Sequence, residues 1–429
     1  MTGFNLHEKS LGSFSSYVHR VANGGDIVVQ PRMGFSCPDL MKSGLLNVKQ
    51  TDATTIGTIT LDSFTRQKDY HAVSASLAAG VHLNGYPIVN HGVETTSQIV
   101  AVLLDDDFQI QVRHGTSLPD DIFRVMLASG ITATEGGPIS YCLPYSRTPL
   151  SHSVAAWRKS CELLANHPEI VHLESFGGCM LGQLSPPSML IAVGLLEAIF
   201  FKSCGIKSLS LSYTQGISFT QDLAALSVLR SLADELLKDI DWHVVVYTYM
   251  GLFPETIAGA KQIIADSAKL VKEAGCERLI VKTISESKRL PTINENIQAL
   301  EHAHRIAKQH TVKQHRYDQE EYQQIYTEVM LIIDCVMNLH TDIGQAILCA
   351  FERGYIDIPY CLHQDNQNKV RSSIDYSNGY LRWVDCGDLP FPKTFKLQIS
   401  QQKDRVDSDE FLGMLKYMRW RYDSHISYK

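Results

Sequence analysis

The chain has 429 residues, of which 44% are hydrophobic and 20% are charged, and its formal net charge is -7 at pH 7. This balance is typical of a globular protein with a large core, and the acidic charge argues against a nucleic-acid-binding surface. The apolar run 190–201 is interrupted by Glu197, which predicts a buried helix rather than a membrane span. The first ten residues lack the apolar core of a signal peptide.

The ten cysteines are scattered along the chain, and no Cys-x-x-Cys pair occurs. This spacing argues against a disulfide framework and against a structural zinc site, so we expect no metal site. Reduced thiols, mostly buried as small apolar groups, are typical of a cytoplasmic protein. We therefore predict a cytoplasmic location.

Along the chain, residues 1–24 read as a helical lead-in that ends at a pair of glycines. Apolar runs then alternate with helix-like patterns at regular intervals, which predicts alternating strands and helices. The predicted strands are 26–31, 56–62, 86–90, 108–113, 131–135, 169–174, 207–213, 242–248 and 278–283. The predicted helices include about 94–104, 117–129, 149–166, 187–203, 219–238, 255–274 and 293–309.

Repeated strand–helix units favour an α/β fold, a (β/α)₈ TIM-type catalytic barrel over residues 25–311. Such a barrel needs eight strands where the sequence predicts nine, and 86–90 is the weakest because it is short and no clear helix precedes it. An open doubly wound sheet is the alternative. It is disfavoured because no Gly-x-Gly-x-x-Gly follows the first strand.

The character of the chain changes after residue 311. Residues 315–341 and 342–352 have the pattern of amphipathic helices, and the chain from 354 onward is polar and rich in turns. Short aromatic strands such as 380–384 interrupt it. We predict that residues 312–429 form a helical and α+β extension packed on the barrel.

Arginines follow three of the predicted strands, at Arg32, Arg66 and Arg113. In a parallel barrel the carboxyl ends of all strands meet at one mouth, where active sites are built. A guanidinium group holds a carboxylate by two parallel hydrogen bonds, and three converging cations suit a dianion. The alternative is three separate surface ion pairs, each contributing less than about 1 kcal/mol.

An acid and two tyrosines follow a fourth strand. Glu135 precedes Gly136-Gly137-Pro138, and at a cationic mouth it would receive an ammonium group or act as a general acid or base. The alternative is that it pairs internally with one of the arginines. Tyr141 and Tyr145 would reach the same pocket as hydroxyl donors, or pack in the core.

Further along the chain, Lys282 and Glu286 lie at another strand end. Their functional interpretation is polar contact with a cofactor, and the alternative is a local ion pair between residues four apart. Phe253 would serve as a stacking platform or belong to the core.

These residues fall within motifs that together resemble the epsilon (E) subunit of adenosylcobalamin-dependent glutamate mutase, also called methylaspartate mutase. The motifs occur in family order across nearly the whole chain. They are Gln30-Pro-Arg32-Met-Gly34, Thr65-Arg66-Gln67, Leu83-Asn84-Gly85-Tyr-Pro87, Arg113-His-Gly-Thr116, Glu135-Gly-Gly-Pro-Ile-Ser-Tyr141, Pro144-Tyr145, Pro186-Pro-Ser-Met189, Gln221-Asp222-Leu-Ala-Ala-Leu226, Gly251-Leu-Phe253-Pro254, Val281-Lys282-Thr283 and Asp357-Ile-Pro359.

The resemblance implies specific roles for the residues that match the family's motifs. An arginine claw for both carboxylates of L-glutamate falls on Arg32, Arg66 and Arg113, and the acid for the substrate amino group falls on Glu135, the catalytic candidate. The matching tyrosines are Tyr141 and Tyr145. The coenzyme contacts fall on Gly34, Asn84, Pro144, Phe253, Lys282, Glu286 and Leu290, with Lys282 and Glu286 addressing the adenosyl ribose.

The implied reaction interconverts L-glutamate and L-threo-3-methylaspartate by a radical mechanism. In the family, a separate sigma subunit binds the cobalamin and supplies the cobalt ligand from an Asp-x-His-x-x-Gly motif. The string Asp69–Ser74 lacks the glycine of that motif, so this chain should be inactive alone. The resemblance also implies a cytoplasmic assembly of two large and two small subunits.

The sequence departs from the family pattern in several places. Pro138 replaces the third glycine of Glu-Gly-Gly-Gly, and residues 246–253 carry Tyr-Thr-Tyr where a His-Gln-Trp run is usual. Two alternatives to a mutase are an acid/base enzyme that acts on an acidic amino acid without cobalamin, and a non-catalytic dicarboxylate-binding homologue. Lys282 and Glu286 favour the mutase, because acid/base chemistry has no need of adenosyl contacts.

Overall fold

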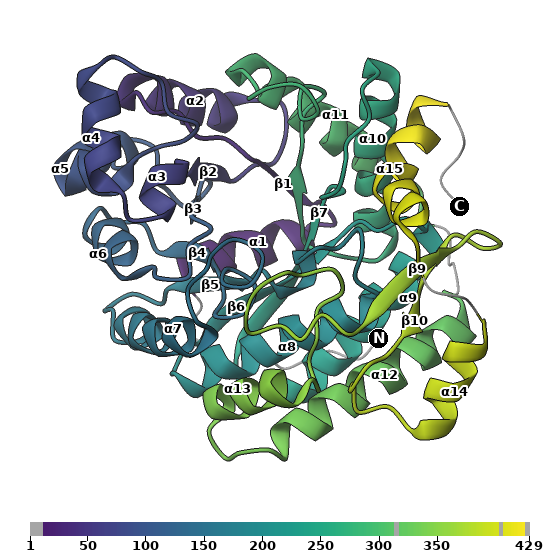
Figure 1. The fold of residues 1–429 in the computed structure, drawn as a ribbon. Helices are drawn as coiled ribbons and strands as arrows, with labels where there is room; N and C mark the ends of the chain where they lie inside the picture. Colours follow the sequence, from purple (N-terminus) through teal and green to yellow (C-terminus); the bar gives the residue numbers. More distant parts are fainter. Residues whose placement is uncertain (1–11, 313–316, 403–405, 425–429) are drawn as a thin grey trace.

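The computed structural model describes residues 12–312, 317–402 and 406–424. In this part of the chain, eight parallel strands lie side by side in the order β1-β8-β7-β6-β5-β4-β3-β2 (Figure 1). They are β1 Val28–Pro31, β2 Gly57–Thr60, β3 Ile110–Arg113, β4 Ala133–Gly136, β5 His172–Ser175, β6 Ser208–Thr214, β7 Asp241–Tyr247 and β8 Arg278–Val281.

The two outer strands of this order, β1 and β2, meet and nearly close the sheet into a barrel. The Val29 amide donates to the Thr54 carbonyl at 2.9 Å, and the Thr60 amide donates to the Met33 carbonyl at 2.8 Å. Helices alternate with the strands and surround them (Figure 1). The predicted (β/α)₈ barrel is therefore confirmed.

The helices of this part begin with α1 and continue through α11. They are α1 Ser13–Asn23, α2 Pro38–Gln50, α3 Ser63–Arg66, α4 Tyr70–Ala78, α5 Ile88–Val100, α6 Asp120–Ala128, α7 Leu150–Ala165, α8 Pro187–Ser203, α9 Phe219–Leu236, α10 Ile257–Glu273 and α11 Ile293–Gln309, with a 3₁₀ turn η1 at Gly177–Cys179. The predicted buried helix is α8, in which Glu197 is also buried. None of the helices among the described residues is long and apolar enough to cross a membrane.

The predicted strand 86–90 was wrong. Tyr86 makes an isolated bridge to Leu61, and helix α5 begins at Ile88. Gly92 has φ of 74° inside α5, so the helix is kinked there. The kink hides the first turn of the helix from a periodicity search, which is why the predicted helix began only at 94.

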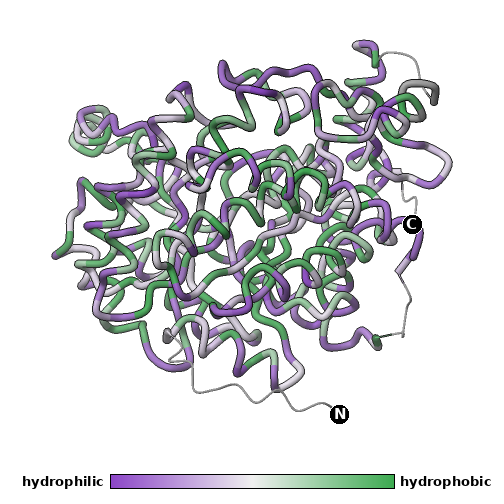
Figure 2. Tube along the Cα trace, turned by 90° about the horizontal axis from the view of Figure 1, so that it is seen from below, coloured by the Kyte–Doolittle hydropathy of each residue, from purple (hydrophilic) through white to green (hydrophobic). Residues whose placement is uncertain are grey.

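The extension contains α12 Gln319–Met337, α13 Ile343–Arg353, an antiparallel hairpin of β9 Arg371–Asp375 and β10 Tyr380–Asp385, and then α14 Lys393–Gln402 and α15 Ser408–Asp423. Residues 315–316 of the predicted helix 315–341 lie outside the described residues. Helix α12 packs on α8 and α9, and α15 packs on α10. Hydrophobic segments are concentrated inside the molecule and hydrophilic segments on its periphery (Figure 2). The domain boundaries at 24 and 311 stay a prediction.

The interior of the barrel contains a buried polar network below the mouth. Arg278 of β8 and Glu174 of β5 are both 0% exposed and form an ion pair. Arg278 also donates to Gln30 of β1 at 2.6 Å and to Ser210 of β6 at 2.9 Å. Because buried charges are tolerated only when they are paired and hydrogen-bonded, this network ties strands together across the barrel.

Replacing Arg278 with methionine should therefore leave Glu174 without its buried cation and remove the hydrogen bonds to Gln30 and Ser210. We expect the free energy of unfolding to fall by about 3 to 5 kcal/mol. Urea denaturation followed by circular dichroism measures this change. The matched control is Arg20→Met, whose partner Asp107 is 87% exposed, and its effect should stay below about 1 kcal/mol. Equal effects of the two substitutions would contradict a structural role for the interior pair.

Candidate active site

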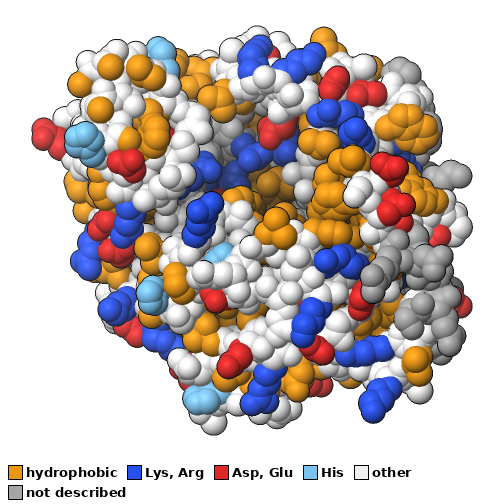
Figure 3. Space-filling view, in the orientation of Figure 1, with side chains coloured by type: hydrophobic (Ala, Val, Ile, Leu, Met, Phe, Trp, Pro, Cys, Tyr) orange, Lys and Arg blue, Asp and Glu red, His pale blue; other side chains and the backbone are white. Residues whose placement is uncertain are grey.

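Charged side chains from successive strands gather at the carboxyl ends of the barrel strands. Arg32 follows β1, Arg66 ends the short helix after β2, Arg113 ends β3 and Glu135 lies in β4. Figure 3 shows a hollow near the centre of this face with Lys and Arg side chains along it. The parallel order of the strands brings these residues together although they are far apart in sequence.

Glu135 is the centre of a buried cluster. Its Oε2 accepts from Arg113 Nε at 2.7 Å, and its Oε1 accepts from the Tyr141 hydroxyl. Glu135 is 1% exposed and Arg113 is 6% exposed. Burial raises the pKa of Tyr141 well above its ordinary value, and the Glu135 charge adds to this, so the phenol keeps its proton and donates.

Glu197 of α8 holds the loop between Glu135 and Tyr141. Its Oε1 accepts from the backbone amides of Ile139 at 3.0 Å and Ser140 at 2.8 Å. A Cβ at Gly137 would lie 2.0 Å from the Glu197 carboxylate, so the close approach requires glycine there. Burial raises the pKa of Glu197 to about 7. In the sequence, Glu197 is a single charge within the apolar run 190–201, and it was predicted only to interrupt that run. A lone charge in a buried helix needs polar partners, and this could have indicated its role.

Arg66 completes the group of three arginines. Its Nε and Nη2 both donate to the carbonyl oxygen of Leu61, at 2.9 and 2.6 Å, and these two bonds fix the side chain. Burial lowers the pKa of Arg66, and the charges of Arg113 and Arg32 lower it further against the opposing effects of Tyr141 and Glu135. The charges of Arg113 and Arg32 are thus felt at Arg66, and Arg32 and Arg66 line one cavity.

Arg32, Lys282 and Glu286 form a second cluster beside the first. Glu286 Oε1 accepts from Arg32 Nη1 at 2.7 Å and lies 3.2 Å from Lys282 Nζ. The Lys282 ammonium lies 5.2 Å from the centre of the Phe253 ring. Burial lowers the pKa of Lys282 to about 8. The pKa of Glu286, although burial opposes the change, falls to about 2 beside Arg32 and Lys282.

A cavity of about 660 Å³ opens next to this second cluster. It is lined by Arg32, Gly34, Thr60, Arg66, Asn84, Glu286, Ser287 and Leu290, among others. Three buried polar atoms of its lining, Arg32 Nε, Thr60 Oγ1 and Ser287 Oγ, have no hydrogen-bond partner among the described residues. Unpartnered buried polar atoms indicate a ligand that supplies the missing donors and acceptors. The lining therefore fits a large polar group such as the predicted coenzyme.

Several predicted contacts also have structural explanations. A Cβ at Gly34 would lie 2.1 Å from the Thr60 carbonyl oxygen, so backbone packing alone requires glycine. Asn84 Oδ1 accepts from the Ser63 amide at 2.9 Å at the start of α3. Leu290 is 60% exposed at the rim of the cavity. The cofactor roles of these residues stay predictions.

Tyr145 lies above Tyr141, with ring centres 6.0 Å apart, and is 53% exposed. Pro144 precedes it in the same loop. The extension holds this loop in place, because Asp365 Oδ2 accepts from the Leu150 amide at 2.7 Å and His363 Nε2 lies 3.0 Å from the Thr148 carbonyl oxygen. The two tyrosines are thus brought to the mouth by contacts from both the barrel and the extension.

Tyr247 at the end of β7 was not among the predicted site residues. Its hydroxyl donates to Glu135 Oε2 at 2.7 Å and also hydrogen bonds to Glu174. The Arg113 guanidinium carbon lies 5.1 Å from the centre of the Tyr247 ring. A tyrosine at the end of an apolar strand is an ordinary core residue by composition, so only its partners reveal this position.

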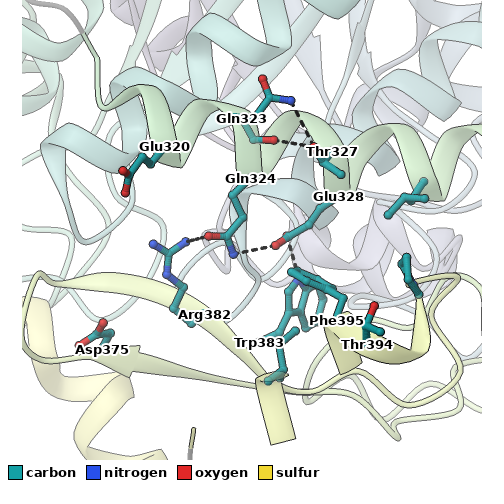
Figure 4. A pocket seen from close by; sticks show the side chains of 13 residues that line it. Glu320, Gln323, Gln324, Thr327, Glu328, Asp375, Arg382, Trp383, Thr394 and Phe395 are labelled. Carbon is teal, nitrogen blue, oxygen red and sulfur yellow. Dashed lines mark hydrogen bonds between the residues drawn. The ribbon is translucent and has the colours of Figure 1, made fainter. Parts of the chain in front are cut away.

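A second cavity, of about 820 Å³, lies in the extension between α12, β10 and α14 (Figure 4). Gln324 there accepts from Arg382 at 3.2 Å and donates to Glu328 at 2.9 Å. Trp383 Nε1 also donates to Glu328, at 3.1 Å. These polar groups satisfy one another and hold the hairpin against α12, so the mouth of the barrel is the better candidate for a functional site.

A parallel barrel with three arginines, a buried glutamate and a polar cavity at the carboxyl ends of its strands has the architecture of a barrel enzyme with an anionic ligand. Comparison with known proteins assigns the chain more narrowly. Residues 10–409 match the family Methylaspartate mutase E chain, and the chain belongs to this family.

Individual relatives resemble the chain over most of its length. The glutamate mutase epsilon subunit of Escherichia coli O157:H7 is 30% identical over 400 residues, which cover 89% of this chain and 81% of the relative. The epsilon subunit of Treponema denticola is 31% identical, with coverage of 89% and 81%. That of Haloarcula marismortui is 30% identical, with coverage of 91% and 82%.

The low pKa of Glu286 makes its contribution to stability depend on pH. A carboxyl whose pKa falls from 4.5 to about 2 on folding stabilises the protein above pH 4.5, and this stabilisation is lost as the pH falls toward 2. Glu286→Gln should therefore lower the free energy of unfolding by about 2 kcal/mol at pH 7, and by progressively less below about pH 4.5.

Urea denaturation of both proteins from about pH 7 to about pH 3.5 measures this difference across the range where it should shrink. The matched control is Glu255→Gln, at a carboxylate that is 60% exposed and pairs with Arg419; its effect should be small throughout. A Glu286→Gln effect that does not change with pH would show that its charge is not the source of the stabilisation.

Proposed function

We propose that this chain is the catalytic large subunit of a coenzyme B12-dependent mutase, an isomerase that interconverts L-glutamate and L-threo-3-methylaspartate by a radical mechanism. The supporting observation is that Arg32, Arg66, Arg113 and Glu135 lie at the carboxyl ends of strands β1 to β4, at one mouth, in a chain of this family. The relatives named above are glutamate mutase subunits, and the site residues fit an acidic amino acid with two carboxylates and one ammonium group.

The three arginines hold and orient the substrate in this proposal. Arg66 is fixed by Leu61 and Arg113 is fixed by Glu135, so little rotational freedom is lost when a carboxylate binds between them. When the arginines bind the carboxylate at each end of the substrate, the flexible diacid is held in a single extended conformation. This position presents one face of its carbon chain to the neighbouring cavity.

Glu135 receives the substrate's ammonium group through its carboxylate. Tyr141 and Arg113 already donate to this carboxylate and hold its plane, which fixes where the ammonium binds. Tyr145 packs edge-on against Tyr141 and would narrow the path to solvent. Water is thereby kept away from the reacting carbons, as radical chemistry requires.

Adenosylcobalamin, when bound, supplies the radical that removes and returns a substrate hydrogen. The residues that would hold it are Gly34, Asn84, Pro144, Phe253, Lys282, Glu286 and Leu290. Lys282 and Glu286 would hydrogen bond to the hydroxyl groups of its ribose, and the unpartnered atoms of the cavity lining would take further polar contacts.

A separate sigma subunit would bind the cobalamin and provide the cobalt ligand, in a cytoplasmic assembly of two large and two small subunits. The alternative of an acid/base enzyme without cobalamin has less support. Acid/base chemistry at Glu135 would give no role to the Lys282–Glu286 pair or to the cavity beside it.

The proposal predicts activity only in the complex. The chain mixed with a small cobalamin-binding subunit carrying Asp-x-His-x-x-Gly, adenosylcobalamin and L-glutamate should form methylaspartate, with cob(II)alamin visible in the absorption spectrum. The chain without that subunit should show no turnover, because its sequence lacks the motif. Turnover by the chain alone would refute this assignment. So would a complex that assembles from both subunits and binds the coenzyme but leaves L-glutamate unchanged.

Arg66→Lys should weaken the binding of L-glutamate to the chain by about 2 kcal/mol, or roughly 30-fold in Kd, because lysine cannot replace a two-point hydrogen bond to a carboxylate. Isothermal titration calorimetry measures the change. Arg147→Lys, at an exposed arginine near the same mouth, is the matched control and should bind normally. Normal binding by both variants would count against a claw.

A further inference from the structure

Tyr247 lies between two carboxylates that belong to different strands. Its hydroxyl oxygen is 2.7 Å from Glu135 Oε2 of β4 and is also within hydrogen-bonding distance of Glu174 Oε1 of β5. Tyr247 and Glu174 are 0% exposed and Glu135 is 1% exposed. Bulk water therefore contributes nothing to these contacts, and the hydrogen atoms needed for them must come from the three groups themselves.

The two hydrogen bonds of the Tyr247 hydroxyl need two hydrogen atoms, but only one is present when both acids are ionised. A phenol carries one hydrogen and donates one hydrogen bond. The second carboxylate would then face only the lone pairs of the phenol oxygen, inside a site of low dielectric where such repulsion is strong. A proton on one of the two acids removes the repulsion, because its O–H then donates to the phenol oxygen.

The phenol itself does not release a proton at neutral pH. Burial raises the pKa of Tyr247 well above its ordinary value, and the Glu135 and Glu174 charges add to this while Arg113 opposes it. The charged and titratable groups that face the three residues come from α3, β3, the loop after β4, η1 and β8. They are Arg66, Arg113, Tyr141, Cys179 and Arg278.

We propose that Glu135 and Glu174 hold one proton between them through the Tyr247 hydroxyl, and that this proton leaves for solvent when the substrate's ammonium group binds Glu135. Tyr247 is then a positioning residue of the amino-group site. The part concerning the empty site stands on the geometry alone, and the part concerning release rests on the proposed substrate.

The charge balance of the buried cluster favours this exchange. Arg66, Arg113 and Arg278 are cations, and with the shared proton in place only one of the two acids is an anion. An arriving ammonium group would add a further positive charge to this surplus. Release of the proton makes both acids anionic, which offsets the added charge, and the ammonium then binds a full carboxylate. The N–H donors of the ammonium replace the lost hydrogen.

Proton release should therefore depend on whether the ligand has an amino group. L-Glutamate has the two carboxylates and the ammonium, whereas glutarate has the same carboxylates and no ammonium. Both should bind the arginines, but only glutamate should displace the proton. Calorimetric titrations in two buffers of different ionisation enthalpy give the number of protons released, and we expect about one for glutamate and about none for glutarate near pH 7.

Two variants separate this role from packing. Glu174→Gln places an amide N–H donor where the shared proton would be, so glutamate should still bind but release no proton. Tyr247→Phe keeps the ring beneath Arg113 and removes only the hydroxyl, so affinity for glutamate should fall and its proton release should change. Glu328→Gln, at a buried acid in the extension, is the matched control and should release the proton as the wild type does.

A measurement without ligand tests the empty site independently of the mutase assignment. The infrared difference spectrum between the wild-type chain and Glu174→Gln should contain a protonated carboxyl C=O band, because the contribution of Glu197, whose pKa burial raises to about 7, is common to both and cancels. The difference spectrum for Glu255→Gln, at an exposed acid, should lack this band. If this band is found and glutamate does not bind, the proton inference stands and the proposed substrate is wrong. Absence of the band, or equal proton release by wild type and Glu174→Gln, overturns the inference.

Discussion

The buried ion pair between Arg113 and Glu135 is the interaction on which the rest of the mouth depends. Both groups are almost completely buried, and an unpaired charge at that depth would cost several kcal/mol. Each therefore fixes the other, and the proposed receptors for a carboxylate and for an ammonium group form a single unit. A substrate that carries both groups meets a site whose charges are already oriented, which is the condition for tight and specific binding.

The polar interior below the mouth explains how that pair stays in place. Tyr247 connects Glu135 to Glu174, and Glu174 pairs with Arg278, which donates to Gln30 on the neighbouring strand β1. A barrel of this kind usually fills its interior with branched apolar side chains. Here a hydrogen-bonded network occupies part of that space, so the position of the site is determined by contacts that span the barrel rather than by the loops alone.

Much of this arrangement was predictable from the sequence, for identifiable physical reasons. Alternation of apolar runs with helical patterns indicated a barrel, and charged residues after the runs indicated its mouth, because both signals are local. The strand at 86–90 was wrong because a kink at Gly92 disguised a helix. Tyr247 and Glu197 were missed because their importance comes from partners far away in sequence. Tyr247 also lies where the chain departs from the family pattern, so resemblance carried no role onto it.

Arg32 connects the predicted substrate site to the predicted coenzyme site. It belongs to the predicted claw, whereas its partner Glu286 belongs to the predicted coenzyme contacts. A guanidinium group has five N–H donors, and Glu286 takes one of them through Nη1 while Nε has no partner among the described residues. Arg32 can therefore hold Glu286 and a substrate carboxylate together. Because Glu286 is also held by Lys282, a coenzyme that binds Lys282 and Glu286 would weaken the hold of Glu286 on Arg32, and the two proposed sites would be linked through this guanidinium group.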